Sequence, residues 1–266
     1  MESTSELDTG TPHSARLWNY WLGGTDNFAA DREAGDVIAG ILPSIVTLAR
    51  EDRKFLRRSV RHLVGDLGIR QILDIGAGLP TAANTHEVAQ AVAPESKVVY
   101  VDNDPLVLVH ARALLDGAPE GRTEYVQADL ADPGSILRAA AGILDFTRPV
   151  AVTLLGILHF LRDDEAALNA VRTLVDAVPA GSCLVIAHGC DDINTAEAGR
   201  IVDFWNERGT PKIKYRSAEQ IGRFFTGLRL LEPGVVPCNR WRPDGETGDV
   251  DVNQFCGVAI KETAAG

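Results

Sequence analysis

The segment from Gln71 to Thr81 reads QILDIGAGLPT, and it decides the fold. Residues 71–75 are short and mostly apolar, which is typical of a strand buried on both faces. Gly76 and Gly78 follow directly and indicate a tight turn, since glycine adopts backbone conformations closed to other residues. A glycine-rich turn after the first strand is where open α/β sheets bind ligands. The segment therefore predicts a ligand site at the carboxyl edge of a parallel sheet.

On the C-terminal side of this turn, strand and helix patterns alternate. Five apolar stretches predict strands at 71–75, 97–101, 123–127, 149–155 and 182–187. Helical stretches separate them at about 82–92, 105–115, 133–145 and 164–177. Such alternation implies right-handed crossovers and a parallel sheet. Two later candidates, 228–236 and 253–261, lie too close together for a crossover helix, so we predict an antiparallel pair at the edge of an α/β sheet.

Acidic residues lie at the ends of three successive predicted strands. Asp74 belongs to the first strand, Asp102 ends the second, and Asp129 follows the third by one turn. Because the carboxyl ends of parallel strands meet at one edge, we expect these three side chains to line one crevice. Asp102 is placed to accept both hydroxyls of a ribose. Asp129 either contacts a ligand in this crevice or caps the next turn.

Two classes of nucleotide ligand use a glycine turn of this kind. A dinucleotide site needs G-x-G-x-x-G, but position 81 holds Thr81, so an NAD-dependent oxidoreductase is the weaker alternative. The pattern D-x-G-x-G, formed by Asp74, Gly76 and Gly78, resembles the first motif of class I S-adenosylmethionine methyltransferases. The ammonium and sulfonium of S-adenosylmethionine are cationic, so a nearby carboxylate suits this ligand.

A wider resemblance covers nearly the whole chain from about residue 12. Its stretches are HSARLWNYWLGGTDNFAADRE, LDIGAGLPTAANTHEVAQ, VVYVDNDPLVLVHARALL and FFTGLRLLEPGVVPCNRWRP. They are similar to those of an actinobacterial family of S-adenosylmethionine-dependent methyltransferases whose substrate is unknown. The resemblance implies a Rossmann-like class I methyltransferase fold with a mostly parallel, seven-stranded sheet, and S-adenosylmethionine as cofactor. It also implies cofactor roles for Asp74, Gly76, Gly78, Asp102 and Asp129, and it supplies no methyl acceptor.

Further candidate site residues flank these positions. Ala77, Asn103 and Leu130 neighbour the motif residues, and Gly156 follows the fourth strand, so we predict that all four line the cofactor site. His159 lies just beyond Gly156. Its imidazole either deprotonates the acceptor, since histidine titrates near neutral pH, or only helps to shape the pocket.

The segment 14–32 is unusually rich in aromatic and polar residues. We expect an N-terminal helical cap over 14–65 that closes on the cofactor, because methyl transfer is an in-line displacement that needs alignment and a dry site. Arg16 or Tyr20 would hold the methionine carboxylate. The alternative is a helix that only packs its aromatic side chains on the core.

The sequence predicts a single domain that follows a polar N-terminal segment. We predict a disordered N-terminus over 1–13 and a single methyltransferase domain over 14–266. Within that domain we expect a cofactor-binding core at 70–188, an acceptor-side insertion at 189–227 and a final strand pair at 228–262. The aromatic residues Phe204, Trp205 and Tyr215 of the insertion favour a partly apolar acceptor.

Composition limits the partners. The net charge of -11 and the pI of about 5.0 disfavour a nucleic acid or an anionic membrane. The arginine-rich stretch 50–62 is interpreted as a solvated helix face. The apolar stretch 150–161 is too short to cross a bilayer, and no secretory signal precedes it, so we expect a cytoplasmic protein. The four cysteines lack metal-site spacing, and we expect no metal.

These features favour an enzyme that methylates a small-molecule acceptor. The alternative is a non-catalytic regulatory protein that binds S-adenosylmethionine or S-adenosylhomocysteine. The oligomeric state cannot be predicted from these residues.

Overall fold

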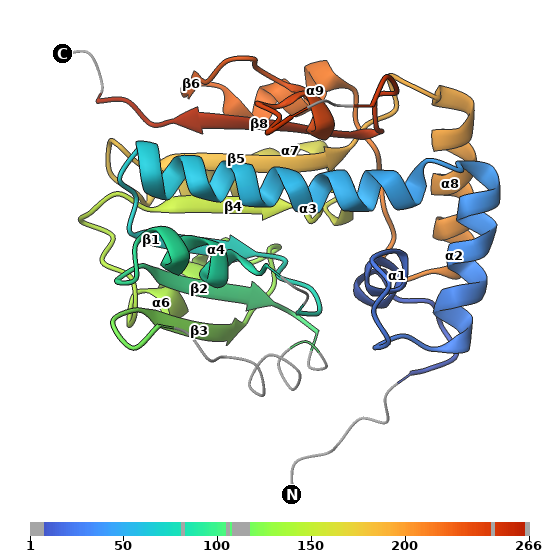
Figure 1. The fold of residues 1–266 in the computed structure, drawn as a ribbon, viewed down its shortest axis with the longest axis horizontal. Coiled ribbons are helices and arrows are strands. Elements are labelled where there is room, and N and C mark those ends of the chain that lie inside the picture. The colour runs from blue at the N-terminus through green and yellow to red at the C-terminus, as the bar shows by residue number, and fades with distance from the viewer. Residues whose placement is uncertain (1–7, 81–82, 105–106, 108–117, 246–247, 264–266) are drawn as a thin grey trace, which may run out of the picture.

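The computed structural model describes residues 8–80, 83–104, 107, 118–245 and 248–263. One sheet runs through the molecule, with the strand order β3-β2-β1-β4-β5-β8-β6 and with β7 paired to β8 (Figure 1). Strands β3 to β5 along this path are parallel, and β8 is antiparallel to β5. The predicted α/β fold with a mostly parallel sheet and an antiparallel edge is confirmed.

The parallel strands coincide closely with the predicted ones. They are β1 (Gln71–Ile75), β2 (Lys97–Asp102), β3 (Arg122–Gln127), β4 (Ala151–Leu155) and β5 (Cys183–Gly189). β1, β4 and β5 are almost wholly buried, because helices cover both faces of the sheet. Strand β8 (Gln254–Ile260) completes the core beside β5.

The antiparallel edge differs from the prediction of one strand over 228–236. Two short strands take its place, β6 (Arg229–Leu230) and β7 (Val236–Pro237), which bring the described strands to eight. A turn separates them, since the N–H of Gly234 donates to the carbonyl of Leu231 at 2.8 Å. Pro233 has no N–H to offer a neighbouring strand, and Gly234 has a φ of 91°.

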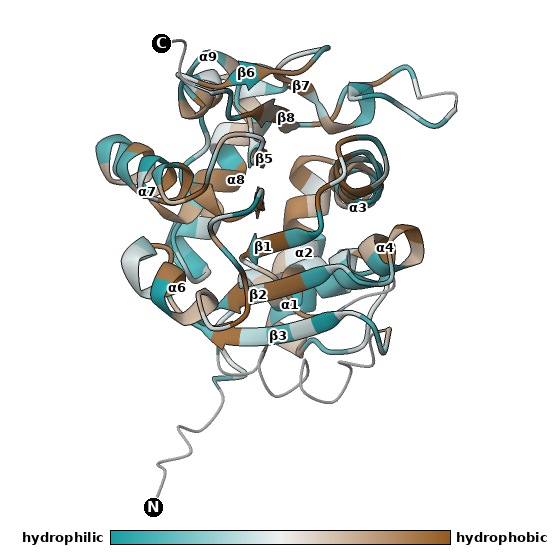
Figure 2. Ribbon diagram, turned by 90° about the vertical axis from the view of Figure 1, so that its left-hand side faces the viewer, coloured by the Kyte–Doolittle hydropathy of each residue, from teal (hydrophilic) through white to brown (hydrophobic). Residues whose placement is uncertain are grey.

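Helices cover the two faces of the sheet in separate layers (Figure 2). α3 (Ile45–Arg61) and α4 (Thr85–Val92) pack on one face, and α6 (Pro133–Ala140) and α7 (Asp164–Asp176) pack on the other. The short α9 (Ala218–Gly222) also joins the second layer. Apart from Val107, the helix predicted over 105–115 lies outside the described residues. No helix within the described ranges is long and apolar enough to cross a membrane.

Two helices lie across the carboxyl ends of the strands. They are α1 (Ser14–Trp21) and α2 (Ala29–Ile41), and α8 (Thr195–Arg208) packs beside α2 (Figure 1). α3 begins at this end and then runs along the sheet, because Leu48, Phe55 and Val60 form a buried stripe. The segment 14–65 thus holds two helices at the strand ends and a third that belongs to the sheet packing.

The residues just before α1 contact the rest of the protein. The N–H of Thr210 donates to the carbonyl of Pro12 at 3.0 Å, and the N–H of Ser14 donates to the carbonyl of Thr210 at 3.2 Å. Of the leader predicted to be disordered, residues 1–7 lie outside the described residues. The part that precedes α1 directly is therefore held against the segment that follows α8.

Candidate active site

A cavity of about 380 Å³ lies at the carboxyl ends of β1, β2 and β4, next to α1. This volume is within the range of about 300–1,000 Å³ that small-molecule sites occupy. Nine of the predicted site residues line it, namely Asp74, Gly76, Ala77, Gly78, Asp102, Asn103, Asp129, Leu130 and Gly156. The topology therefore brings together residues that lie far apart in the sequence.

The glycine turn is fastened to the neighbouring strand. Gly76 has a φ of 81°, and a Cβ at this position would lie 2.7 Å from the Cβ of Ile157. Its N–H donates to the carbonyl of Val101 at 2.8 Å. Gly78 has a φ of 63°, and its N–H donates to Oδ2 of Asp102 at 2.9 Å. Only glycine fits the first position, and the turn is held in a fixed place beside the cavity.

Asp102 is held by backbone donors on both carboxylate oxygens. Oδ2 accepts from Gly78, and Oδ1 accepts from the N–H of Asp104 at 2.9 Å. Burial raises the pKa of Asp102 above its ordinary value, although these two hydrogen bonds oppose the shift. Each carboxylate oxygen can accept a second hydrogen bond, so the side chain can still receive a pair of hydroxyls.

Asp129 and Asn103 form a second polar pair at the same edge. Nδ2 of Asn103 donates to Oδ2 of Asp129 at 2.8 Å, and the N–H of Ala131 donates to Oδ1 at 2.8 Å. Asp129 therefore caps the turn and lines the cavity at the same time, so the two sequence interpretations are compatible.

Asp74 lies buried at the base of the cavity. Its Oδ1 accepts from Oγ1 of Thr153 at 2.6 Å, and its Oδ2 accepts from Oγ1 of Thr85 at 2.6 Å. Burial raises the pKa of Asp74, while the two hydroxyl donors favour the ionised form. The carboxyl group is thereby fixed in orientation between β4 and α4.

Asp52 and Arg53 of α3 also line the cavity, and sequence reasoning missed both. Burial raises the pKa of Asp52 to about 6, and Nε2 of Gln254 donates to its Oδ1 at 3.3 Å. Burial lowers the pKa of Arg53, whose guanidinium donates to the carbonyl of Ala83 at 3.0 Å. The prediction that the arginine-rich stretch 50–62 is a solvated helix face is wrong for these two positions, and also for Arg58, which is 7% exposed and donates to the carbonyls of Trp241 and Cys238. One feature of the sequence could have revealed Asp52. It follows Leu48 by four residues, so it lies on the apolar face of the helix and not on the solvated one.

Arg16 and Tyr20 do not reach the cavity. Nε of Arg16 donates to Oδ2 of Asp31 at 2.8 Å in a buried ion pair. The hydroxyl of Tyr20 donates to Oδ1 of Asp36 at 2.8 Å on the surface. The helical period explains this correction, since the face of α1 toward the cavity carries Ser14, Ala15, Trp18 and Asn19, and Leu22 continues it just beyond the helix.

His159 lies in the short 3-10 turn Leu158–Phe160 after β4, and it is only 6% exposed. It lines a second, smaller hollow and not the main cavity. Burial lowers the pKa of His159 well below its ordinary value, so its imidazole is neutral at physiological pH.

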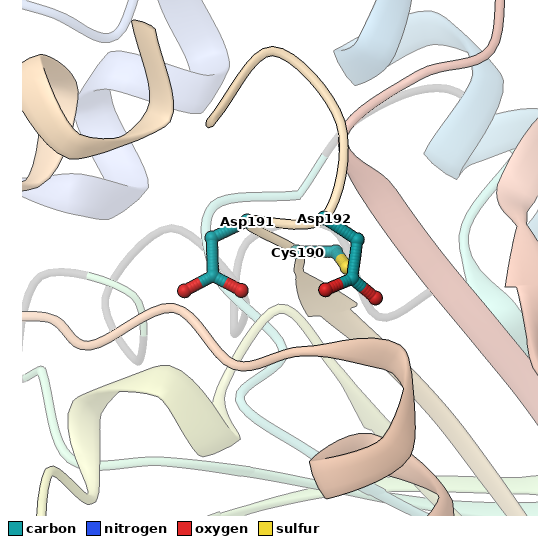
Figure 3. A group of neighbouring side chains, drawn as sticks. All are labelled: Cys190, Asp191 and Asp192. Atoms are coloured by element: carbon teal, nitrogen blue, oxygen red, sulfur yellow. The ribbon is translucent and has the colours of Figure 1, made fainter. Parts of the chain in front are cut away.

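Among the described residues, Cys190, Asp191 and Asp192 form a group close enough to ligate a metal ion (Figure 3). Burial raises the pKa of Cys190 to about 12, so the thiol keeps its proton at neutral pH. A cysteine ligates a metal ion as the thiolate, and Oδ2 of Asp192 already accepts from the N–H of Ala218 at 2.7 Å. We assign no metal to this group.

A family model described as S-adenosyl methyltransferase matches residues 1–262 of the chain. The chain belongs to this family. The methyltransferase is similar to two solved structures over almost their whole length. A DUF574 family protein from Streptomyces avermitilis is 45% identical, with a TM-score of 0.92 over 96% of this chain and 99% of that one. A protein of Thermobifida fusca assigned as a methyltransferase is 38% identical, with a TM-score of 0.90 over 98% and 99%.

A more distant neighbour supports the fold alone. Human N-acetylserotonin methyltransferase, solved with S-adenosylmethionine, is 12% identical to this methyltransferase, with a TM-score of 0.51 over 87% of this chain and 57% of that one. None of the curated proteins matches the chain. The class I methyltransferase fold, S-adenosylmethionine as cofactor and the resemblance to an actinobacterial family are all confirmed.

Proposed function

We propose that this methyltransferase transfers the methyl group of S-adenosylmethionine to a small-molecule acceptor inside the 380 Å³ cavity. The observation that carries the proposal is the arrangement of the charged side chains that line it. Asp52 and Asp74 lie beside Arg53 at one end, and Asp102 and Asp129 lie at the ends of neighbouring strands. This pattern complements a ligand with a zwitterionic amino-acid end, a cationic sulfur and a ribose.

At the adenosine end, Asp102 would accept the two ribose hydroxyls. The two backbone N–H groups that donate to Asp102 fix its orientation, and each carboxylate oxygen can still accept another hydrogen bond. Asp129, held by Asn103, would accept from the adenine amino group, with the buried Leu130 against the ring. The glycine turn would let the backbone come close to the cofactor at Gly78, where a Cβ meets nothing within 4 Å.

At the methionine end, Arg53 takes the role that the sequence suggested for Arg16 or Tyr20. Its buried guanidinium would bind the carboxylate, since arginine matches carboxylate geometry with paired donors. Asp74 would face the ammonium, and Asp52 adds a second buried carboxyl beside it. The zwitterionic amino-acid end of the cofactor would thus lie beside the guanidinium of Arg53 and the carboxyl groups of Asp52 and Asp74.

When bound, S-adenosylmethionine supplies a methyl group activated for displacement. The residues of this chain orient the reactants and exclude water, and no strong base is needed for that. Trp18 of α1 and Leu22 just after it, with Phe160 and Pro211, line the apolar side of the cavity. This side leaves an apolar surface for an acceptor, which favours catalysis over the alternative of a regulatory protein that only binds the cofactor.

The experiment is calorimetric titration with S-adenosylmethionine, S-adenosylhomocysteine and NAD. We expect the first two to bind and NAD to give no heat. Asp102→Asn should weaken S-adenosylhomocysteine binding by about 10- to 100-fold, as the loss of a charged hydrogen-bond partner predicts. The weakening should vanish for 2′,3′-dideoxyadenosine, which lacks the ribose hydroxyls.

Asp132→Asn is the matched control, because Asp132 caps α6 outside the cavity and asparagine caps equally well. Well-folded protein that binds neither S-adenosylmethionine nor its demethylated product would refute the proposal.

A further inference from the structure

Asn19 of α1 is a buried amide in the wall of the cofactor cavity, and none of the proposed cofactor contacts uses it. Its side chain is 3% exposed. Oδ1 accepts from Nδ2 of Asn27 at 2.9 Å, whereas Nδ2 of Asn19 has no hydrogen-bond partner in the part of the chain that the structure describes. Proteins pair nearly all buried polar groups, so an unpaired donor in a cavity wall points to a ligand.

A short chain of hydrogen bonds sets the orientation of this amide. Nη1 of Arg32 donates to Oδ1 of Asn27 at 3.0 Å, and an arginine side chain can only donate. The other end of the Asn27 amide is therefore its NH₂ group, which donates to Oδ1 of Asn19 and to the carbonyl of Gly24, at 2.9 Å each. Asn19 is thus left with its own NH₂ group, and not its oxygen, to offer to a ligand.

The NH₂ group of Asn19 is open to a ligand and not sealed inside the protein. Among the described residues, the side-chain atoms that are both enclosed and unpartnered are Nδ1 of His13, Nδ1 of His159 and Nε1 of Trp241. Nδ2 of Asn19 is unpartnered but does not belong to this set, so part of its surface stays open, and the cavity is the space that this otherwise buried residue lines. Gly24 leaves room for the amide, because a Cβ there would lie 2.4 Å from Nδ2.

The surroundings of Asn19 restrict the chemistry of the group that it can bind. Ala15 lies one turn before it, Trp18 precedes it directly and Leu22 lies one turn after it, so the wall around the amide is apolar. Arg53 is the only arginine or lysine in the described lining, and the proposed function assigns it to the carboxylate of the cofactor. An anionic group beside Asn19 would lose its hydration and face the four aspartates of the cavity. An uncharged oxygen that accepts hydrogen bonds fits this donor.

We propose that Nδ2 of Asn19 donates a hydrogen bond to an uncharged carbonyl oxygen of the methyl acceptor, whose apolar body lies against Trp18 and Leu22. The inference rests on the proposed function and names the substrate class of the same cavity, which is neutral, mostly apolar carbonyl compounds that also carry the nucleophile. Asn19 determines this specificity, and Asn27 and Arg32 are positioning residues that act through it. Acceptors with a carboxylate or a phosphate in place of the carbonyl are excluded.

The test uses fluorine NMR to measure the binding of three probes to protein saturated with S-adenosylhomocysteine. The probes are 4-fluoroacetophenone, the hydrocarbon 1-ethyl-4-fluorobenzene, which lacks the carbonyl, and the anionic 4-fluorobenzoate. We expect the ketone and the hydrocarbon to bind and the benzoate to stay free.

Asn19→Asp keeps the oxygen that pairs with Asn27 and replaces the donor by a second oxygen. The affinity for the ketone should therefore fall by about tenfold, while the affinity for the hydrocarbon stays the same. Asn169→Asp is the matched control, because it makes the same change at an exposed position of α7 outside the cavity, and it should bind all probes as the wild type does.

Asn19→Leu removes the donor without adding a charge, and it covers the case in which Asn19→Asp does not fold. It should lower the ratio of ketone to hydrocarbon affinity by about five- to tenfold. No binding of the ketone to the wild type, equal binding of ketone and benzoate, or an unchanged affinity ratio in a folded Asn19 variant would overturn the inference.

A cofactor arm separates this role of Asn19 from a contact with the methionine carboxylate. The Asn19 variants should bind S-adenosylhomocysteine and 5′-methylthioadenosine, which lacks the amino-acid end, as the wild type does. A loss of affinity for S-adenosylhomocysteine alone would assign Asn19 to the cofactor and would also overturn the inference. Failure of the wild type to bind S-adenosylhomocysteine would instead refute the proposed function.

Discussion

Asp52 is a buried carboxyl group in the cavity wall with a single described hydrogen bond, from Gln254 at 3.3 Å. Burial raises its pKa from 3.8 to about 6 in the folded protein. The folded state therefore holds this proton more tightly than the unfolded state, so stability falls as the pH rises from about 4 to 6. Above pH 6 the ionised side chain costs about 3 kcal/mol, at about 1.4 kcal/mol for each pKa unit. A residue this costly, in a cavity wall, is expected to serve the ligand.

Replacing Asp52 by asparagine should stabilise the protein without ligand. We expect Asp52→Asn to raise the free energy of unfolding by up to about 3 kcal/mol at pH 8 and to have little effect at pH 4, because the carboxyl group is then protonated in both states. Urea unfolding at the two pH values measures this. Asp203→Asn, at an exposed position on α8, should change nothing. Equal stability of wild type and Asp52→Asn at pH 8 would contradict the buried ionised carboxylate.

Asp52 also shows which residues of the candidate site can be predicted from one sequence and which cannot. Asp74, Asp102 and Asp129 were predicted to lie together because parallel strands must end at one edge, whatever the details of packing. Asp52 and Arg53 belong to a helix outside that rule. Whether a helical residue faces solvent or a cavity depends on where the helix packs, and the chain alone did not fix the place of α3.

At the scale of elements, Asp31 joins the starts of α1 and α2. Its carboxylate pairs with Arg16 and also accepts from the N–H groups of His13 at 2.9 Å and Phe28 at 2.8 Å. The side chain is fully buried, so these donors replace its hydration. Arg16 thus positions α1, whose other face lines the cavity with Trp18.

Breaking this ion pair should loosen α1 without disturbing the sheet. Removing one partner of a buried pair costs about 3–5 kcal/mol, so we expect Arg16→Met to speed hydrogen exchange in α1 and α2 and to leave the amides of β1 and β4 unchanged. Cofactor affinity should fall as well, because α1 forms part of the cavity wall. Tyr20→Phe is the control, since it removes only a surface hydrogen bond to Asp36. Wild-type exchange of α1 in Arg16→Met would refute the positioning role.

The strands were predictable because burial on both faces leaves continuous apolar runs, such as β4 and β5. The strands of the antiparallel edge were less predictable. Residues 228–236 have the composition of a strand, and only the turn at Gly234 reveals that β6 and β7 are separate. Local composition specifies strands well where both faces are covered, and poorly where a turn interrupts an exposed edge.

At the scale of the whole molecule, charge should discriminate between the cofactor and its product. The chain carries a net charge of -11, and the cavity holds four aspartates, Asp52, Asp74, Asp102 and Asp129. S-Adenosylmethionine has one more positive charge than S-adenosylhomocysteine, because its sulfur is a sulfonium. The field of the protein and of these side chains should therefore favour the substrate over the product.

This preference should depend on pH through Asp52. The ammonium that both ligands carry and the sulfonium of S-adenosylmethionine alone each favour the ionised carboxyl group, so either ligand lowers its pKa from about 6 and S-adenosylmethionine lowers it further, with release of protons between pH 5 and 6. At pH 5 about nine-tenths of the free protein carries a protonated Asp52, so the affinity ratio of S-adenosylmethionine to S-adenosylhomocysteine should fall by up to about tenfold from its value at pH 7.5. Calorimetry in two buffers of different ionisation enthalpy measures both the ratio and the protons released. Asp52→Asn should remove the pH dependence while the sheet and the glycine turn stay intact. A ratio that is the same at pH 5 and pH 7.5 in the wild type would mean that this carboxyl group does not sense the sulfonium.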